Sequence, residues 1–273
     1  MPKEETPARR AAQWLINEHA QGRRFAPLSG PLRPTDIAAA YDVQDALVAQ
    51  RQAAWQCGLA GYKIALTTPA MRNFVGYDNS IAGQVLSRDV VNAPARLRLS
   101  DFGHLGFECE LAFRVGEDLP TGESPPDRAR ISRAIAAIAP AFELVDDRHA
   151  DYTLFNRDDG TTMLSLAADN AWNCGVVLGA WREDWADIDL AAVHGVLRIN
   201  DAVVGEGWGR DVLGHPLDAM VWIARHLHER GRGLKKGELV ITGSLITSRF
   251  PQAGDRVVFS AAGVGEIELA VEQ

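Results

Sequence analysis

Apolar residues recur at helical spacing over roughly the first sixty positions of the chain and gather in short runs after that. From Pro7 to about Gln21 the apolar positions follow a period near 3.6 and a glycine comes next, which predicts a first helix. Thr35 is a suitable N-cap for a second helix that ends before Gly58. The Pro- and Gly-containing segment 26–34 is expected to link the two helices.

After Gly61 the apolar runs become short and are separated by Gly, Pro, Asn and Asp. They predict strands over residues 62–66, 105–115, 163–166, 175–178, 196–199, 239–241, 256–260 and 266–271. Two helices are predicted among them, over residues 127–138 and 216–228, and Pro216 suits a first helical turn. Helices followed by a mostly β body favour an α+β fold over a regular alternation of strands and helices.

Composition narrows the classes of protein to consider. The chain has 273 residues, 47% of them hydrophobic, and a net charge of −8, with Lys and Arg scattered along its length. We therefore expect a large core and no nucleic-acid interface. The charged N-terminus does not resemble a signal peptide, no segment is apolar enough to span a bilayer, and no Cys-x-x-Cys pair is present. These features predict a cytoplasmic protein that does not bind membranes.

Three glutamates in apolar surroundings are the first candidates for chemistry. Glu108 and Glu110 are two apart in a predicted strand, so their side chains point the same way and repel unless a proton or cation lies between them. Glu143 lies in a second apolar run, where an uncompensated charge is costly to bury. Three carboxylates without His or Cys suit Mg²⁺ or Mn²⁺. The alternative is that Glu108 and Glu110 lie on a solvated edge strand and Glu143 pairs with an arginine.

Several segments together resemble the hydratase/decarboxylase branch of the fumarylacetoacetate hydrolase superfamily. They are the Glu-x-Glu strand and residues 61–67, 140–143, 168–171, 213–217 and 241–245. The resemblance implies an N-terminal helical segment over residues 1–60, a β-roll catalytic domain over 61–273, a Mg²⁺ or Mn²⁺ ion held by the three glutamates, and a homo-oligomer.

The implied activity is hydration of a 2-hydroxy-2,4-dienoate to a 4-hydroxy-2-oxo acid through a metal-stabilised enolate, as in the degradation of aromatic compounds. A metal-dependent decarboxylase of a 2-oxo-enedioate, of the 4-oxalocrotonate type, is the nearest alternative. A third possibility is a non-catalytic partner subunit, because related hydratases and decarboxylases are found associated with each other. A buried carboxylate cluster argues against a scaffold, which has no need for one.

The resemblance also implies roles for single residues. Lys63 matches an active-site lysine and Asp78 an acidic residue in the loop after it, so both are candidates for proton transfer. Without the resemblance, Lys63 reads as a strand lysine reaching solvent and Asp78 as a residue that closes a turn. Ser244 matches a residue that lines the substrate pocket.

Two further residues are candidates for substrate binding. Arg148 could bind a substrate carboxylate through its guanidinium, although pairing with the adjacent Asp146 or Asp147 is equally plausible. Asp169 could order the lysine or a water, or it could cap the following segment.

The chain departs from the family pattern in two places. Gly106 stands where hydratases often carry an arginine, and the stretch 171–175 is one residue longer than usual. Both differences bear on the substrate and not on the metal ligands. His215, directly before Pro216, is as plausible in a turn or helix start as in catalysis.

Overall fold

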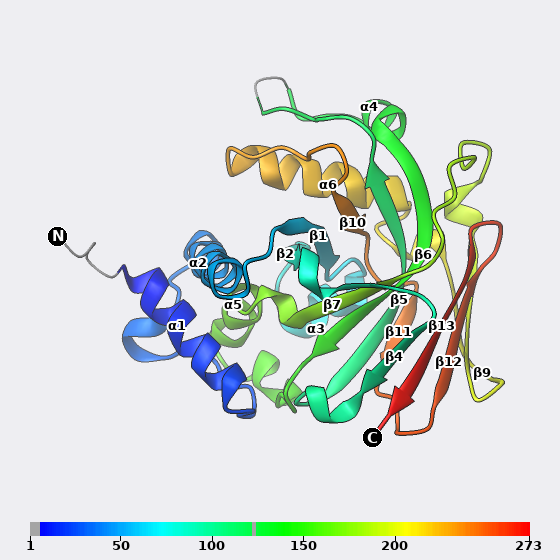
Figure 1. The fold of residues 1–273 in the computed structure, drawn as a ribbon. Coiled ribbons are helices and arrows are strands. Elements are labelled where there is room, and N and C mark those ends of the chain that lie inside the picture. The colour runs from blue at the N-terminus through cyan, green and yellow to red at the C-terminus, as the bar shows by residue number, and fades with distance from the viewer. Residues whose placement is uncertain (1–5, 122–123) are drawn as a thin grey trace.

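Two N-terminal helices pack against a third helix from the middle of the chain in a computed structural model that describes residues 6–121 and 124–273. The helices α1 (Pro7–Ala20) and α2 (Ile37–Trp55) contact each other, and α2 contacts α5 (Thr161–Ala168). Figure 1 shows these helices as one group beside the strands. Their shared core is apolar and includes Leu15, Leu47 and Leu166. The N-cap of α2 is Asp36, one residue after the predicted Thr35.

The larger sheet carries the long central pair of strands. Its strand order is β2-β1-β10-β5-β6-β7-β3, and β11 also pairs with β5. The strands are β1 (Leu59–Ala65), β2 (Ile81–Leu86), β3 (Val90–Asn92), β5 (Leu105–Val115), β6 (Ile135–Asp146), β7 (Asn173–Leu178), β10 (Leu239–Ile241) and β11 (Ile246–Arg249). Strands β5 and β6 are antiparallel and pair along almost their whole length.

A second sheet packs against one face of the first. Its order is β4-β13-β12-β8-β9, with β4 (Ala95–Arg98), β8 (His194–Ile199), β9 (Ala202–Trp208), β12 (Arg256–Ala261) and β13 (Gly265–Glu272). Phe142 of β6 links the sheets, with its ring centroid 5.3 Å from that of Phe107 and 6.2 Å from that of Phe259. Because strand side chains alternate, residues 108, 110 and 143 point to the opposite face of the larger sheet.

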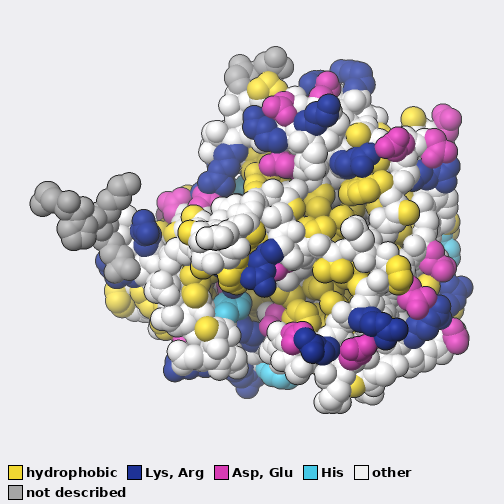
Figure 2. Space-filling view, in the orientation of Figure 1, with side chains coloured by type: hydrophobic (Ala, Val, Ile, Leu, Met, Phe, Trp, Pro, Cys, Tyr) yellow, Lys and Arg dark blue, Asp and Glu magenta, His cyan; other side chains and the backbone are white. Residues whose placement is uncertain are grey.

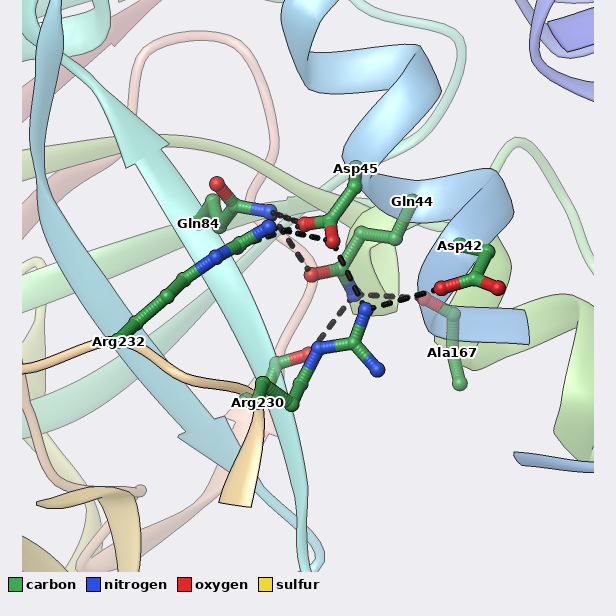
Figure 3. Close-up of polar contacts among 8 residues, drawn as sticks. Asp42, Gln44, Asp45, Gln84, Ala167, Arg230 and Arg232 are labelled. Atoms are coloured by element: carbon green, nitrogen blue, oxygen red, sulfur yellow. Dashed lines mark hydrogen bonds and ion pairs between the residues drawn. The ribbon is translucent and has the colours of Figure 1, made fainter. Parts of the chain in front are cut away.

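The other α-helices of the described residues are α3 (Pro69–Val75), α4 (Arg128–Ala134) and α6 (Pro216–Glu229). His215 is the N-cap of α6, and its Nδ1 accepts the backbone N–H of Leu217 at 3.0 Å. The helix-start role considered for His215 is thus confirmed. After α6, Arg230 and Arg232 both bind Asp45 of α2 at 2.8 and 2.6 Å, which ties this end of the chain to the N-terminal helices (Figure 3).

The predicted elements differ from the observed ones in two main places. Residues 163–166, predicted as a strand, lie inside helix α5, because a short apolar run cannot distinguish a buried helix from a buried strand. The predicted helix 127–138 ends at Ala134, and β6 begins at Ile135. Helix α3 and strands β2, β3, β4, β9 and β11 were not predicted, since most of them are short or polar on one face.

The surface shown in Figure 2 carries charges of both signs, interspersed around a central region where apolar side chains gather. Within the described part of the chain, no helix combines the length and apolar character that a bilayer crossing requires.

Candidate metal centre

Three carboxylates converge on the face of the larger sheet opposite the second sheet. Glu108 and Glu110 lie on β5, and the backbone pairing places Glu143 of β6 directly across from Glu108. One oxygen from each side chain lies within 4.8 Å of the others, a spacing that could hold a metal ion. Glu110 and Glu143 have no solvent exposure, whereas Glu108 is partly exposed. The alternative of a solvated edge strand is therefore wrong for this face.

Each carboxylate is oriented by a donor from another element. The backbone N–H of Gly243 donates to Glu110 Oε2 at 2.7 Å, and the Ser248 hydroxyl donates to Glu108 Oε1. Two buried oxygens, Oε1 of Glu110 and Oε2 of Glu143, have no hydrogen-bond partner. A buried carboxylate oxygen without a donor is costly, so these two atoms mark the positions where a cation fits.

The charges of the cluster do not balance. Lys63 Nζ lies 3.0 Å from Glu143 Oε1, and three ionised carboxylates with one ammonium would carry a net charge of about −2. Burial raises the pKa of both Glu108 and Glu110, and the neighbouring charge of Glu143 raises them further. One divalent cation would neutralise the excess charge, and an all-oxygen donor set suits a hard ion. The residues present therefore fit the predicted metal.

Lys63 is held inside the protein instead of reaching solvent. It lies on β1, its side chain is 2% exposed, and it points at Glu143. Gly83 on the adjacent strand makes this possible, because a Cβ at that position would come within 2.9 Å of Lys63 Cγ. The reading of Lys63 as a solvent-reaching strand lysine is wrong, and so is the pairing of Glu143 with an arginine.

Asn173 supports the same oxygen of Glu143. Its Nδ2 donates to Glu143 Oε1 at 2.9 Å, beside the Lys63 ammonium. Neither Asn173 nor Ser248 was predicted from the sequence, although a polar side chain at the start of a buried apolar strand was a usable signal for Asn173.

Two other predicted residues lie differently. Ser244 Oγ accepts the N–H of Cys109 at 3.0 Å, so it borders the backbone between the two glutamates of β5. Asp78 has a fully exposed side chain, and its carboxylate lies 3.9 Å from Arg72 Nε. Among the described residues, no contact links Asp78 to the glutamates.

Arg148 and Asp169 bind each other. The guanidinium Nη2 lies 2.6 Å from Asp169 Oδ2, and both residues are almost fully buried. His19 of α1 binds the second oxygen of Asp169, also at 2.6 Å. The alternative considered for Arg148, side-chain pairing with Asp146 or Asp147, is wrong, because the partner is more distant in sequence; the backbone N–H of Arg148 does bind Asp146. Binding of a substrate carboxylate by Arg148 stays a prediction.

The space above Gly106 is filled by an aromatic ring. A Cβ at Gly106 would lie 3.1 Å from Phe250 Cε1, and the Phe250 ring stacks on His104 with the centroids 4.3 Å apart. Gly106 shares the sheet face of Glu108 and precedes it by two residues, so Phe250 borders the exposed end of the carboxylate cluster.

Residues 49–272 match the family model described as fumarylacetoacetate (FAA) hydrolase, C-terminal. The chain belongs to the fumarylacetoacetate hydrolase family. It is 31% identical over 260 residues to 2-keto-4-pentenoate hydratase 1 of Dechloromonas aromatica, covering 94% of each chain. It is 26% identical to a 4-oxalocrotonate decarboxylase of a Pseudomonas species, covering 96% of each.

The fold of this fumarylacetoacetate hydrolase family member is also found in a solved structure. The 4-oxalocrotonate decarboxylase from Pseudomonas putida G7, complexed with magnesium and adipate, superposes with a TM-score of 0.86 over 97% of both chains, at 24% identity. The family resemblance and the α+β fold expected from the sequence are confirmed.

Proposed function

We propose that this protein is a divalent-metal-dependent hydratase that adds water to a 2-hydroxy-2,4-dienoate and forms a 4-hydroxy-2-oxo acid. The convergence of Glu108, Glu110 and Glu143, with two buried oxygens left without a donor, carries the proposal. The hydratases among its relatives support the reaction, since several are 30 to 31% identical over more than nine-tenths of the chain.

The three glutamates would hold Mg²⁺ or Mn²⁺. Solved structures of related fold contain such ions: one 4-oxalocrotonate decarboxylase is complexed with magnesium, and a fumarylpyruvate hydrolase from Pseudomonas aeruginosa is complexed with Mn²⁺ and pyruvate. A bound ion of this kind supplies Lewis-acid stabilisation of the negative charge that develops on the oxygens of a 2-oxo acid. The exposed side of Glu108 is the approach by which substrate reaches the centre.

Proton transfer requires a second set of groups. Hydration bonds the oxygen of water to one carbon and leaves a proton on another, so a group must take a proton and a group must give one. Lys63 Nζ is fixed beside Glu143 and shielded from bulk water, which suits it to this role. Asp78 remains a candidate for the second group, provided that its exposed loop approaches the site when substrate binds. Ser244 would contribute to the pocket wall next to β5.

The surroundings of Gly106 and Arg148 favour hydration over decarboxylation. A 4-oxalocrotonate-type substrate carries a second carboxylate, whereas a dienoate ends in an uncharged carbon chain. Phe250 covers Gly106, and Nη1 and Nη2 of Arg148 already bind the Arg23 carbonyl and Asp169, so neither position offers two free N–H donors to a second carboxylate. Decarboxylation remains the second candidate, because the decarboxylase relative spans 96% of the chain.

A substrate panel tests the assignment. The purified protein with Mn²⁺ is given a 2-hydroxy-2,4-dienoate and a 2-oxo-enedioate, and both loss of the diene absorbance and CO₂ release are followed. Water addition to the dienoate, abolished by EDTA and by Lys63→Ala, is the expected result. Release of CO₂ without water addition would overturn the hydratase assignment, and no turnover of either compound would favour a non-catalytic partner subunit.

We also propose that the protein is cytoplasmic and forms a homo-oligomer. This homo-oligomer would in turn associate with a related hydratase or decarboxylase. The helical segment 1–60 and the catalytic domain 61–273 would then act as one unit, since α2 packs directly on α5. Sedimentation of the purified chain, alone and mixed with a related decarboxylase, measures both assemblies.

A further inference from the structure

The segment that leads into Asn173 has an unusual backbone. Asn170, Ala171 and Trp172 have φ values of 56°, 48° and 59°, three consecutive left-handed residues with no glycine among them. Non-glycine residues adopt this conformation singly and at an energetic cost, so the surrounding structure must impose it. Such conformations cluster at functional sites, and this one ends where Asn173 binds Glu143.

A bulge in β7 decides which way Asn173 points. Leu144 of β6 pairs with Gly175, but the next residue, Val145, pairs with Asn173, so Cys174 is an extra residue on β7. In a regular ladder Asn173 would oppose Asp146 and face away from the glutamates, because a shift of one residue reverses a strand's faces. The bulge places Asn173 opposite Val145, on the same face as Glu143.

The left-handed segment is fixed at its start by buried polar contacts. Asp169 binds Arg148 and His19, each at 2.6 Å. The Asn170 side chain makes two hydrogen bonds to the backbone of Gln84. Its Oδ1 accepts the N–H at 2.7 Å, and its Nδ2 donates to the carbonyl at 2.8 Å. Burial works to raise the pKa of Asp169, but the charges of His19 and Arg148 hold it below its ordinary value.

Arg148 connects this segment to the strand that carries Glu143. It follows β6 by two residues, and Arg148 and His149 are themselves left-handed, with φ values of 46° and 55°. The ion pair between Arg148 and Asp169 therefore joins the end of β6 to the approach of β7. Strands β6 and β7 carry Glu143 and Asn173 and pair with each other, and the ion pair lies beyond the end of that ladder.

We propose that Arg148, Asp169 and His19 are positioning residues for the metal centre. By fixing residues 170–172 they keep the Asn173 amide on Glu143 Oε1, so that Oε2 of Glu143 faces the place of the ion. His19 brings helix α1 into this arrangement, so the N-terminal helices act on the metal site although they contribute none of its ligands. The inference rests on the proposed function, because it requires that the glutamates bind a metal.

The test is direct Mn²⁺ binding to the full-length protein without substrate, measured by calorimetry and by the EPR signal of free Mn²⁺. Loss of a residue that orients a ligand weakens metal affinity by about 10- to 100-fold. We expect a weakening in this range for Asn173→Ala and for Arg148→Lys. His19→Ala should weaken binding by a smaller factor, because Arg148 still holds Asp169.

A double variant distinguishes positioning from general loss of stability. If Arg148 acts through Asn173, the variant R148K/N173A should bind Mn²⁺ about as well as N173A alone, since coupled residues are not additive. The control is Ile131→Val, at a buried position of helix α4, which packs against α6. It should lower the unfolding midpoint and leave Mn²⁺ affinity within about twofold of the native value.

Unchanged Mn²⁺ affinity in folded R148K and H19A proteins would overturn the inference and leave the proposed function intact. Full additivity in the double variant would also overturn it. If R148K does not fold, H19A decides the question, because the His19 side chain is partly exposed and its removal disturbs less packing than a change at the buried Arg148. Failure of the native protein to bind Mn²⁺ would refute both the inference and the proposed metal dependence.

Discussion

Replacing Glu110 with glutamine tests two properties of the carboxylate cluster separately: its binding of a metal ion and its effect on the free energy of unfolding. Glu110 Oε2 accepts the Gly243 N–H at 2.7 Å, and a glutamine oxygen can keep that bond. The new amide then lies where Glu110 Oε1 has no partner, and it can donate to Glu143, whose Oε2 also has none. The substitution removes one buried negative charge and supplies a missing donor.

The expected stabilisation of E110Q over the native protein is largest without metal and shrinks when metal is added. A hydrogen bond to a charged group contributes about 1.5–3 kcal/mol, so in EDTA we expect E110Q to be about 1–3 kcal/mol more stable than the native protein. An ion at 100 times its dissociation constant stabilises the folded state by about 2.7 kcal/mol. Because E110Q loses a ligand, its gain from Mn²⁺ should fall below about 1 kcal/mol, and turnover should be lost.

Urea unfolding in EDTA and in excess Mn²⁺, at pH near 7.5, measures both effects. The control is Glu183→Gln, an exposed glutamate paired with Arg114, which should change both free energies of unfolding by no more than about 0.5 kcal/mol. A lower stability of E110Q in EDTA would refute the charge imbalance that we infer. An undiminished Mn²⁺ gain would refute Glu110 as a ligand.

Three further predictions concern the surroundings of the site. Gly83→Ala should lower stability by about 1–3 kcal/mol in urea unfolding and displace Lys63, because the added Cβ meets the lysine stem and Asn170 O at 2.9 Å; an unchanged midpoint would contradict this tight packing. The lowered pKa of Asp169 contributes stability above the ordinary Asp pKa that is lost as pH falls through the folded value, so the urea midpoint of D169N should depend less on pH in the acid range than that of the native protein. His215→Ala removes the N-cap of α6 and should cost about 1 kcal/mol without changing Mn²⁺ affinity, and a loss of affinity would show that α6 influences the centre.

The sequence by itself determined the fold class, the family and the strand that carries two of the three carboxylates. The period-two spacing of Glu108 and Glu110 inside an apolar run fixes their common face wherever the strand lies, because side chains of a strand alternate. The predicted bounds of β5, 105–115, are those of the structure, because turn-forming Gly and Asp residues flank the apolar run on both sides. The metal ligation itself stays a prediction until binding is measured.

Only the tertiary structure decided how the supporting residues are used. Pairing between strands set Glu143 across from Glu108, and the bulge at Cys174 turned Asn173 toward it. That bulge lies within 171–175, the stretch that the sequence predicts to be one residue longer than is usual in the family. The Arg148 side chain binds Asp169 and not its sequence neighbours. Left-handed residues at 148–149 and 170–172 change the direction of the chain beside both partners. Strand register and side-chain pairing depend on contacts between residues distant in the chain, and local patterns in the sequence do not specify those contacts.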